Sequence, residues 1–328
     1  MQNPSCVNDS KGEWFEVFNM SSDTIDINNW TISDNGSNAH LISDSLPVLI
    51  PPGSYFVMGN NQVQNLNGGY FCNYGYSGFT LSNGADEIIL KDSSGLTIDS
   101  VAYDGGGTFP DPAGASMEFI SCPDADNNIG ANWRISSSRT YSFDSTCTDF
   151  GSPGAKGINQ SALYYPKFDF EEILCGNQTF IASIAGDYDS VLWYYDSQLN
   201  ILIGTGDSLI IHNNPLGSKT IWVAVQDSNC QLISNLEYTV SEAFDTTIFH
   251  QSCDSFLSPH NGLNITSSGI YSDTLITVLG CDSLIKLNLE IYPSYQFNIQ
   301  DTVCDEFITH TGQSINQSGM YFDSLLSI

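Results

Sequence analysis

The chain has 328 residues, of which 37 are Asp or Glu and 8 are Lys or Arg, so its formal net charge is −29. This charge argues against binding of nucleic acid or anionic lipid, because both require Lys and Arg against phosphate. The apolar fraction of 41% is that of a folded protein, and the length suffices for two or three domains. No apolar run approaches the ~18 residues that span a bilayer, so we expect no membrane insertion.

Residues 12–104 predict a series of short strands separated by turns. The first is expected at 13–18, where both faces are apolar enough to be covered, and the second at 23–32, with Ile25, Ile27 and Trp30 as core candidates. Later strands are expected at 55–58, 87–91 and 97–103, after turns rich in Gly, Pro and Ser. Short strands between such turns are typical of an all-β sandwich.

The order of these segments resembles the lamin tail domain found in secreted proteins of Bacteroidota-type bacteria. The resemblance is carried by residues 12–19, 29–34, 50–59, 79–92 and 98–103, and it continues through Asn-Trp-Arg at 132–134 and Gly-Ser-Pro-Gly at 151–154. It implies a first domain over residues 1–158 in a secreted or cell-surface protein. It also implies a strand before residue 1, so we expect Met1 to be an internal methionine.

Residues 159–242 predict a second β-sandwich, with strands at 178–183, 190–195, 208–212 and 220–226. Cys175, Trp193 and Cys230 follow one another in the order of an immunoglobulin-type core, although their spacing is looser than in antibody domains. The segment resembles the Ig-like modules of bacterial surface adhesins. That resemblance implies a disulfide between Cys175 and Cys230.

Residues 243–328 contain an internal repeat, which we divide into copy 1 (243–292) and copy 2 (293–328). Cys-Asp-Ser-Phe at 253–256 recurs as Cys-Asp-Glu-Phe at 304–307, and Ser-Gly-x-Tyr at 268–271 recurs at 318–321. The pattern resembles tandem repeats of Bacteroidota secreted proteins and predicts a disulfide between Cys253 and Cys281. Copy 2 ends before a matching second cysteine, so Cys304 is expected to lack its partner within this sequence.

The nine cysteines include no Cys-x-x-Cys pair, which gives a structural zinc site or a redox motif little support. Their wide spacing in an Asn- and Ser-rich β protein favours disulfides in an oxidising compartment over buried thiols. In the first domain Cys122 with Cys147 is the nearer pair, which leaves Cys6 with Cys72. Four cysteines allow three connectivities, so these two pairs stay open.

No catalytic motif stands out: the sequence has no Gly-x-Ser-x-Gly elbow, no His-Glu-x-x-His helix and no phosphate loop. Glu13 and Glu16 are at i and i+3 of a strand, so they face opposite sides and do not form a carboxylate pair. We therefore expect no enzyme activity, no catalytic residue and no organic cofactor in this chain.

Two segments are candidates for binding. Asp124, Asp126 and Asn128 place oxygen atoms at alternating positions, as hard-cation sites such as calcium sites do, but the Gly and Glu of an EF-hand are absent, and an Asx-rich turn is the alternative. Four aromatic residues in a Gly- and Asn-rich loop, Tyr70, Phe71, Tyr74 and Tyr76, are either a contact patch for protein or carbohydrate or a cap on the sandwich.

These observations favour a non-catalytic module of a secreted or cell-surface bacterial protein that serves adhesion, spacing or display. Its partner would be a protein or carbohydrate at the cell surface. The alternative is an accessory region of a secreted hydrolase, of nuclease or phosphatase type, whose catalytic domain lies outside this sequence. A chromatin role like that of eukaryotic lamin tails is disfavoured, because residues 1–160 hold 18 acidic and 5 basic side chains, a net charge of −13.

Overall fold

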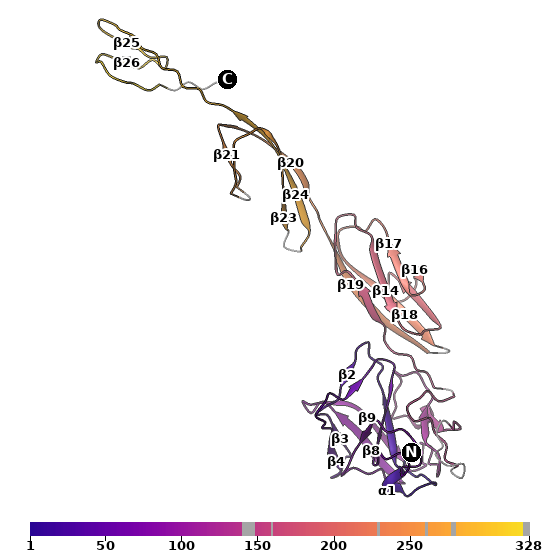
Figure 1. Cartoon of the computed structure of the whole chain (residues 1–328). Helices are drawn as coiled ribbons and strands as arrows, with labels where there is room; N and C mark the ends of the chain where they lie inside the picture. Colours follow the sequence, from indigo (N-terminus) through magenta and orange to yellow (C-terminus); the bar gives the residue numbers. More distant parts are fainter. Residues whose placement is uncertain (140–147, 159, 228–229, 260–261, 277–279, 324–328) are drawn as a thin grey trace. The chain divides into compact units, whose positions relative to one another are not determined.

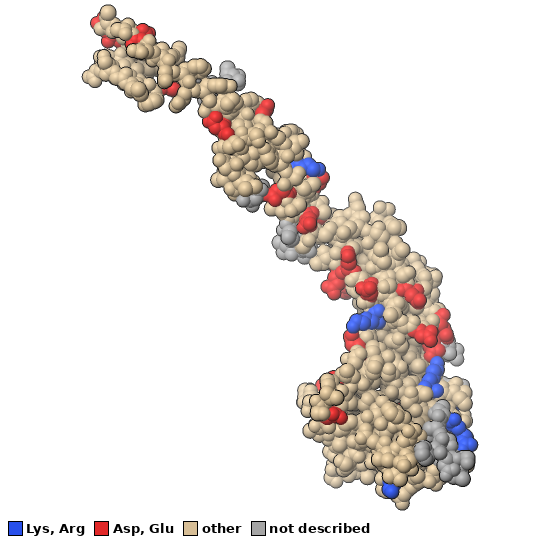
Figure 2. Space-filling view, in the orientation of Figure 1, with Lys and Arg blue, Asp and Glu red and all other residues tan. Residues whose placement is uncertain are grey.

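The computed structural model describes residues 1–139, 148–158, 160–227, 230–259, 262–276 and 280–323. The chain is 43% strand and 2% helix, which confirms the all-β fold class (Figure 1). It forms two compact units, the first comprising Met1–Ala243 with Val278–Cys281 and the second Phe244–Thr277 with Asp282–Ile328. Acidic side chains lie on the drawn face of both units, and basic ones are sparse there (Figure 2).

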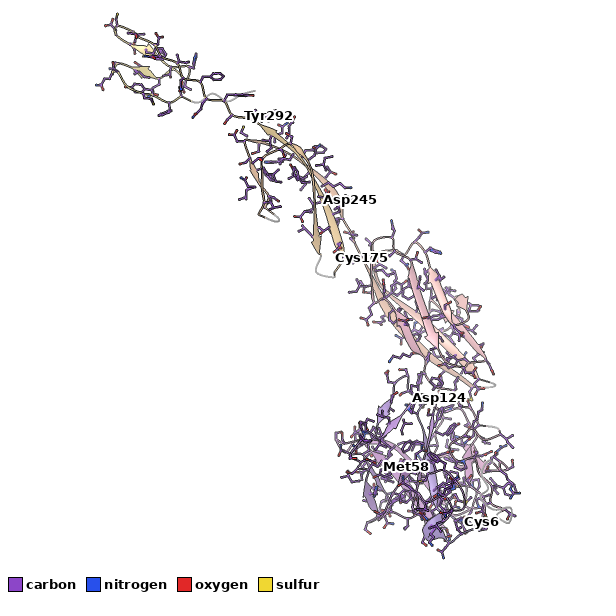
Figure 3. The ribbon with its side chains drawn as sticks, viewed as in Figure 1. Cys6, Met58, Asp124, Cys175, Asp245 and Tyr292 are labelled. Atoms are coloured by element: carbon purple, nitrogen blue, oxygen red, sulfur yellow. A yellow bond between two sulfur atoms is a disulfide. The ribbon has the colours of Figure 1, made fainter. Side chains whose placement is uncertain are left out.

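The first sandwich is built from two main sheets. One has the order β1-β6-β7, and the other has the order β4-β3-β8-β9. Their bounds are Trp14–Phe18 (β1), Tyr55–Gly59 (β6), Tyr74–Gly75 (β7), Ala39–Leu41 (β4), Thr31–Ser33 (β3), Ala85–Lys91 (β8) and Thr97–Asp104 (β9). Residues such as Ile32, Ile42 and Met58 are fully buried between the sheets, and Met58 is labelled in Figure 3.

Smaller elements complete this sandwich. They are the helix α1 (Asp9–Gly12), the pair β2 (Ile25–Asp26) and β5 (Leu49–Ile50), the pair β10 (Met117–Phe119) and β11 (Trp133–Ile135), and the 3-10 helix η1 (Gly130–Asn132). The strand predicted over 23–32 is two strands, because Asn29 has a φ of +67° and turns the chain between β2 and β3.

The second sandwich has the Ig-like arrangement of two packed antiparallel sheets with one parallel edge pair. One sheet has the order β12-β14-β17, and the other has the order β13-β19-β18-β15-β16. The bounds are Lys167–Phe170 (β12), Phe180–Ala185 (β14), Ser208–Ile211 (β17), Ile173–Cys175 (β13), Cys230–Ser241 (β19), Gly217–Asp227 (β18), Ser190–Tyr194 (β15) and Leu202–Thr205 (β16). Strand β14 alternates buried and less buried residues, so one face of its sheet covers the core.

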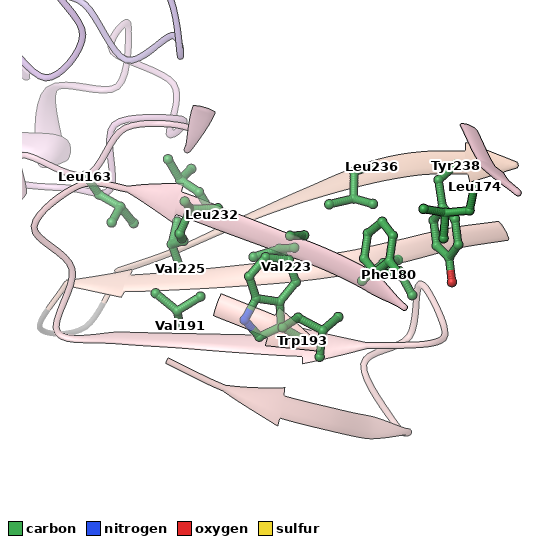
Figure 4. Close-up of a cluster of buried hydrophobic side chains, with 14 of the residues drawn as sticks. Leu163, Leu174, Phe180, Val191, Trp193, Val223, Val225, Leu232, Leu236 and Tyr238 are labelled. Carbon is green, nitrogen blue, oxygen red and sulfur yellow. The ribbon is translucent and has the colours of Figure 1, made fainter. Parts of the chain in front are cut away.

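Trp193 is at the centre of that core and is 0% exposed, among Phe180, Val191 and Val223 (Figure 4). Its indole Nε1 donates to Gly206 O at 2.8 Å. The tryptophan therefore takes the central place that the sequence predicts, with its one polar atom satisfied.

The second unit contains a sheet of order β20-β24-β23, with bounds Asp245–Cys253, Asp282–Tyr292 and Gly269–Ile276. Strand β20 runs parallel to β24, and β23 runs antiparallel to it. Two short hairpins follow the sequence repeat: β21 (Phe256–Leu257) with β22 (Asn264–Ile265), and β25 (Phe307–Ile308) with β26 (Ser314–Ile315).

The two copies share local contacts as well as strands. The Tyr271 hydroxyl donates to Ser267 O at 2.8 Å, and in copy 2 the Tyr321 hydroxyl donates to Gln317 O at 3.0 Å. Each tyrosine thus bonds to the carbonyl four residues before it. This one tyrosine contact is the same in both segments.

Candidate functional site

Two of the three predicted cation ligands, Asp126 and Asn128, make hydrogen bonds within the turn and to β9, whereas Asp124 is exposed. Asp126 Oδ1 accepts from Asn128 N at 2.9 Å, and Asn128 Oδ1 accepts from Ala102 N of β9 at 2.9 Å. Asn128 Nδ2 also donates to Ser100 O at 2.8 Å. The turn is thereby attached to β9, and in the described part of the chain no three His, Cys, Asp or Glu side chains gather to hold a metal. Calcium binding at Asp124, Asp126 and Asn128 remains a prediction from the sequence.

The aromatic loop mainly closes the sandwich. Tyr70 and Tyr76 are 1% and 3% exposed, and the Tyr70 hydroxyl donates to Glu13 O at 3.1 Å. The Tyr74 hydroxyl accepts from Ser43 N at 2.9 Å. Of the four, Phe71 is the one that is mainly exposed, at 67%. The contact patch is therefore reduced to one residue, and the capping alternative describes the other three.

Glu13 and Glu16 take separate structural positions on β1 and the residue before it. Glu13 is buried, and its Oε2 accepts from Leu81 N at 3.1 Å and from Asn60 Nδ2 at 3.3 Å. Glu16 Oε2 accepts from Gly154 N at 2.9 Å. Burial raises the pKa of each carboxyl to about 7. The two acids bond to different loops, as expected for residues that do not work as a pair.

An apolar cleft of about 120 Å³ opens beside β1 in the first sandwich. Its lining includes Phe15 and Val17 of β1, Ile88 of β8, Val101 of β9 and Trp133 of β11. Sites for small organic ligands usually measure about 300–1,000 Å³. The cleft is therefore too small to enclose a substrate of ordinary size.

The disulfides differ from the predicted pairs. Cys122 bonds to Cys230, and Cys175 bonds to Cys281, with Cα–Cα distances of 5.3 and 5.4 Å. The predicted pairs Cys175–Cys230, Cys253–Cys281 and Cys122–Cys147 are therefore wrong.

The strand register explains the first of these errors. Cys175 lies opposite Ser241, the last residue of β19, whereas Cys230 is the first residue of β19. Cys230 and Ser241 are eleven residue steps apart along the strand (241 − 230), which corresponds to roughly 36 Å. A disulfide needs Cα atoms within about 7 Å of each other, so this pair cannot form.

A parallel strand register of the same kind explains why Cys253 and Cys281 of copy 1 do not pair. Cys253 lies opposite Tyr292, the last residue of β24, whereas Cys281 directly precedes Asp282, its first residue. These two cysteines are again at opposite ends of a long strand, and Cys253 is an exposed free thiol.

The predicted pair Cys6–Cys72 is also wrong, because Cys72 is free. Cys72 is a buried free thiol whose Sγ donates to Tyr74 O at 3.1 Å, and burial raises its pKa to about 11. Cys6 takes part in a disulfide, whereas Cys147 lies outside the described residues. Cys304 is exposed and free.

The connection between the two sandwiches of the first unit is held by polar contacts as well as by the Cys122–Cys230 disulfide. Lys156 Nζ lies 2.9 Å from an Asp227 carboxylate oxygen that also accepts from Ala162 N at 3.3 Å. Tyr165 N donates to Met20 O at 2.8 Å. The segment around 156–165 is thus bonded to both sandwiches.

Together the fold and the cross-links define an all-β protein of β-sandwiches joined by long-range disulfides. Residues 1–105 match the family model described as Lamin Tail Domain, which confirms the predicted resemblance for these residues. No curated protein matches the chain. In the described part of the structure, no helix is both long and apolar enough to cross a membrane.

Proposed function

We propose that this chain is a non-catalytic structural and binding segment of a secreted or cell-surface protein. The observation that carries the proposal is the pair of disulfides Cys122–Cys230 and Cys175–Cys281, which interleave along the sequence and each span more than 100 residues, with separations of 108 and 106. Disulfides of this kind persist in oxidising compartments and are rare in the cytosol. Each also restricts the unfolded chain, which favours the folded form.

The surface supports a role in spacing and display. A net charge of −29 keeps such a chain soluble and repels other polyanions. The partner we propose is a protein or carbohydrate at the cell surface, contacted through exposed aromatic and apolar side chains. Phe71 in the first unit and Phe249 in the second, 67% and 75% exposed, are the first positions to examine.

Location is tested on intact cells that express the protein from its own gene. External protease should remove the antibody signal for this chain while a cytosolic marker survives. Protection of the chain until the cells are lysed would contradict a surface location. Recovery from the medium instead would indicate the secreted form.

The non-catalytic part of the proposal is tested with the purified, oxidised chain. We expect no turnover of nucleic acid, phosphoesters or glycans above that of a reduced and unfolded sample, with divalent metal present. Turnover that copurifies with the folded chain would refute this part. A glycan array probed with the chain and with a Phe71→Ser, Phe249→Ser variant then tests the proposed contacts.

A further inference from the structure

Cys175 and Cys253 occupy the same structural position in two successive parts of the chain. Cys175 is the last residue of β13, which runs parallel to β19, the last strand of its sheet in chain order. Cys253 is the last residue of β20, which runs parallel to β24, the last strand of its own sheet in chain order. Each also lies opposite the final residue of that last strand, Ser241 for Cys175 and Tyr292 for Cys253.

The backbone after each cysteine repeats the match. Gly176 N donates to Ser241 O at 2.8 Å, and Asp254 N donates to Tyr292 O at 2.9 Å. Gly176 and Asp254 have φ values of +61° and +60°. A left-handed conformation is uncommon outside Gly, and Asp is one of the residues that tolerate it, so the equal φ values indicate that the two turns have the same construction.

Cys230 and Cys281 form a second equivalent pair. Cys230 is the first residue of β19, and Cys281 directly precedes the first residue of β24. Both are bonded to a cysteine more than 100 residues earlier, namely Cys122 and Cys175. In both cases that the structure describes, the cysteine at the start of the sheet's last strand in chain order therefore forms a disulfide with a cysteine in the preceding part of the chain.

Cys253 has the position of Cys175 but not its bond. It is exposed and free, and Cys281 is both at the far end of β24 and already bonded to Cys175. We propose that Cys253 is a cross-linking site for the cysteine at the start of the last strand of a following repeat. The two thiols would lose two protons and two electrons to a disulfide oxidant, such as glutathione disulfide, which is reduced to two thiols.

The alignment of copy 2 with copy 1 indicates where the partner cysteine of Cys253 would lie. Residues 296–304 align with β20 at an offset of 51, the offset that relates Cys253 to Cys304, but they form no strand in the structure. The partner of β20 is β24, and the equivalent of β24 aligns after Ile328. The cysteine that would bond to Cys253 is thus expected near the start of that strand, just as Cys281 precedes β24.

The test appends a strand to the full chain. Ile328 aligns with Val278 at the offset of 50, so residues 279–292 of the chain itself are appended after Ile328, which brings a new cysteine into the position of Cys281. After oxidation in glutathione buffer, free thiols are alkylated and the disulfides are mapped by mass spectrometry. We expect Cys253 to bond to the appended cysteine and Cys304 to be alkylated. Alkylated Cys253, or a bond from Cys304 to the appended cysteine, would overturn the proposal.

Two matched controls accompany this chain. An appended strand with serine in place of its cysteine should leave Cys253 alkylated, and Cys253→Ser should leave the appended thiol alkylated. The bonds Cys122–Cys230 and Cys175–Cys281 must persist in every variant, which reports that the rest of the chain has folded.

A second measurement does not depend on folding of the extended chain. The unmodified chain is incubated with a synthetic peptide of residues 279–292 in the same buffer. Because the peptide should pair with residues 296–304 as the last strand of copy 2, we expect Cys253 to be modified at least fivefold more than Cys304. Equal modification of the two exposed thiols would count against the site.

Discussion

Cys175 and Cys230 are separated by the length of β19, although they flank Trp193 in the order of an immunoglobulin core. Cys175 is opposite Ser241 at the end of this strand, and Cys230 begins it. The second sandwich consequently forms its core around Trp193 without an internal disulfide, and its cysteines bond elsewhere in the chain.

The long-range disulfides should contribute strongly to stability. Cys230→Ser opens a loop with a sequence separation of 108, and the chain-entropy relation gives a loss of about 5 kcal/mol. Chemical denaturation of the first unit measures this loss. Cys304→Ser removes an exposed free thiol and is the matched control, which should leave the midpoint unchanged. A similar midpoint for both variants would contradict the prediction.

Interleaved disulfides should also limit how far the chain extends under force. Between Cys122 and Cys281 the chain has 159 residues (281 − 122), whereas the path through the Cys122–Cys230 bond has 51 (281 − 230). Reduction should therefore lengthen the fully unfolded segment between Cys122 and Cys281 by 108 residues (159 − 51), or roughly 370 Å. Single-molecule pulling between handles attached beside these two positions, with and without dithiothreitol, measures the difference. The Cys122→Ser, Cys175→Ser double variant should show the reduced length under both conditions.

The contribution of Glu13 to stability should fall as the pH rises from 4.5 to 7. Burial raises the pKa of Glu13 to about 7, above its ordinary value of 4.5, so the folded state binds more protons than the unfolded state between these values. The contribution of Glu13 is fully present below pH 4.5 and is lost as the pH passes 7. Glu16 acts in the same direction.

Urea denaturation at several pH values between 4.5 and 7 tests whether Glu13 causes this pH dependence. Glu13→Gln keeps an acceptor for Leu81 N but cannot ionise, so it should flatten the pH dependence. Exposed Glu242→Gln is the control and should retain the wild-type slope. An unchanged slope in Glu13→Gln would show that this carboxyl does not titrate in the folded protein as described.

The core of the second sandwich should depend on Trp193. Trp193→Ala removes a side chain that is 0% exposed, and changes of this kind cost about 3–5 kcal/mol. Ile181→Ala on the outer face of β14, where Ile181 is 57% exposed, should cost far less. Thermal unfolding monitored by circular dichroism compares the two, and equal losses would place Trp193 outside the core.

Much of the fold could be predicted from local patterns. The strands expected at 55–58, 97–103, 190–195 and 208–212 appear as β6, β9, β15 and β17 with ends within one residue. Alternation of apolar residues and the positions of Gly and Pro depend on the local backbone, so they can be recognised in sequence. The strand over 23–32 was wrong because Asn29 adopts a left-handed conformation that its residue type permits but does not require.

The candidate sites were harder to predict, because they depend on what surrounds each side chain. The side chains of Tyr70 and Tyr76 have the polarity of a contact surface, yet both are buried in the folded first sandwich. Asn128 has the oxygen of a cation ligand, yet that oxygen accepts from Ala102 N of β9, 26 residues earlier in the chain. Both outcomes depend on contacts between segments that the local sequence does not specify.

The sequence by itself determined that this is an acidic all-β protein, with strands placed by residue alternation and turn chemistry and with a first domain that resembles lamin tails. Only the tertiary structure decided which cysteines bond. A disulfide requires two Cα atoms within about 7 Å, and the parallel register of β13 with β19, and of β20 with β24, separates Cys175 from Cys230 and Cys253 from Cys281 by the length of a long strand.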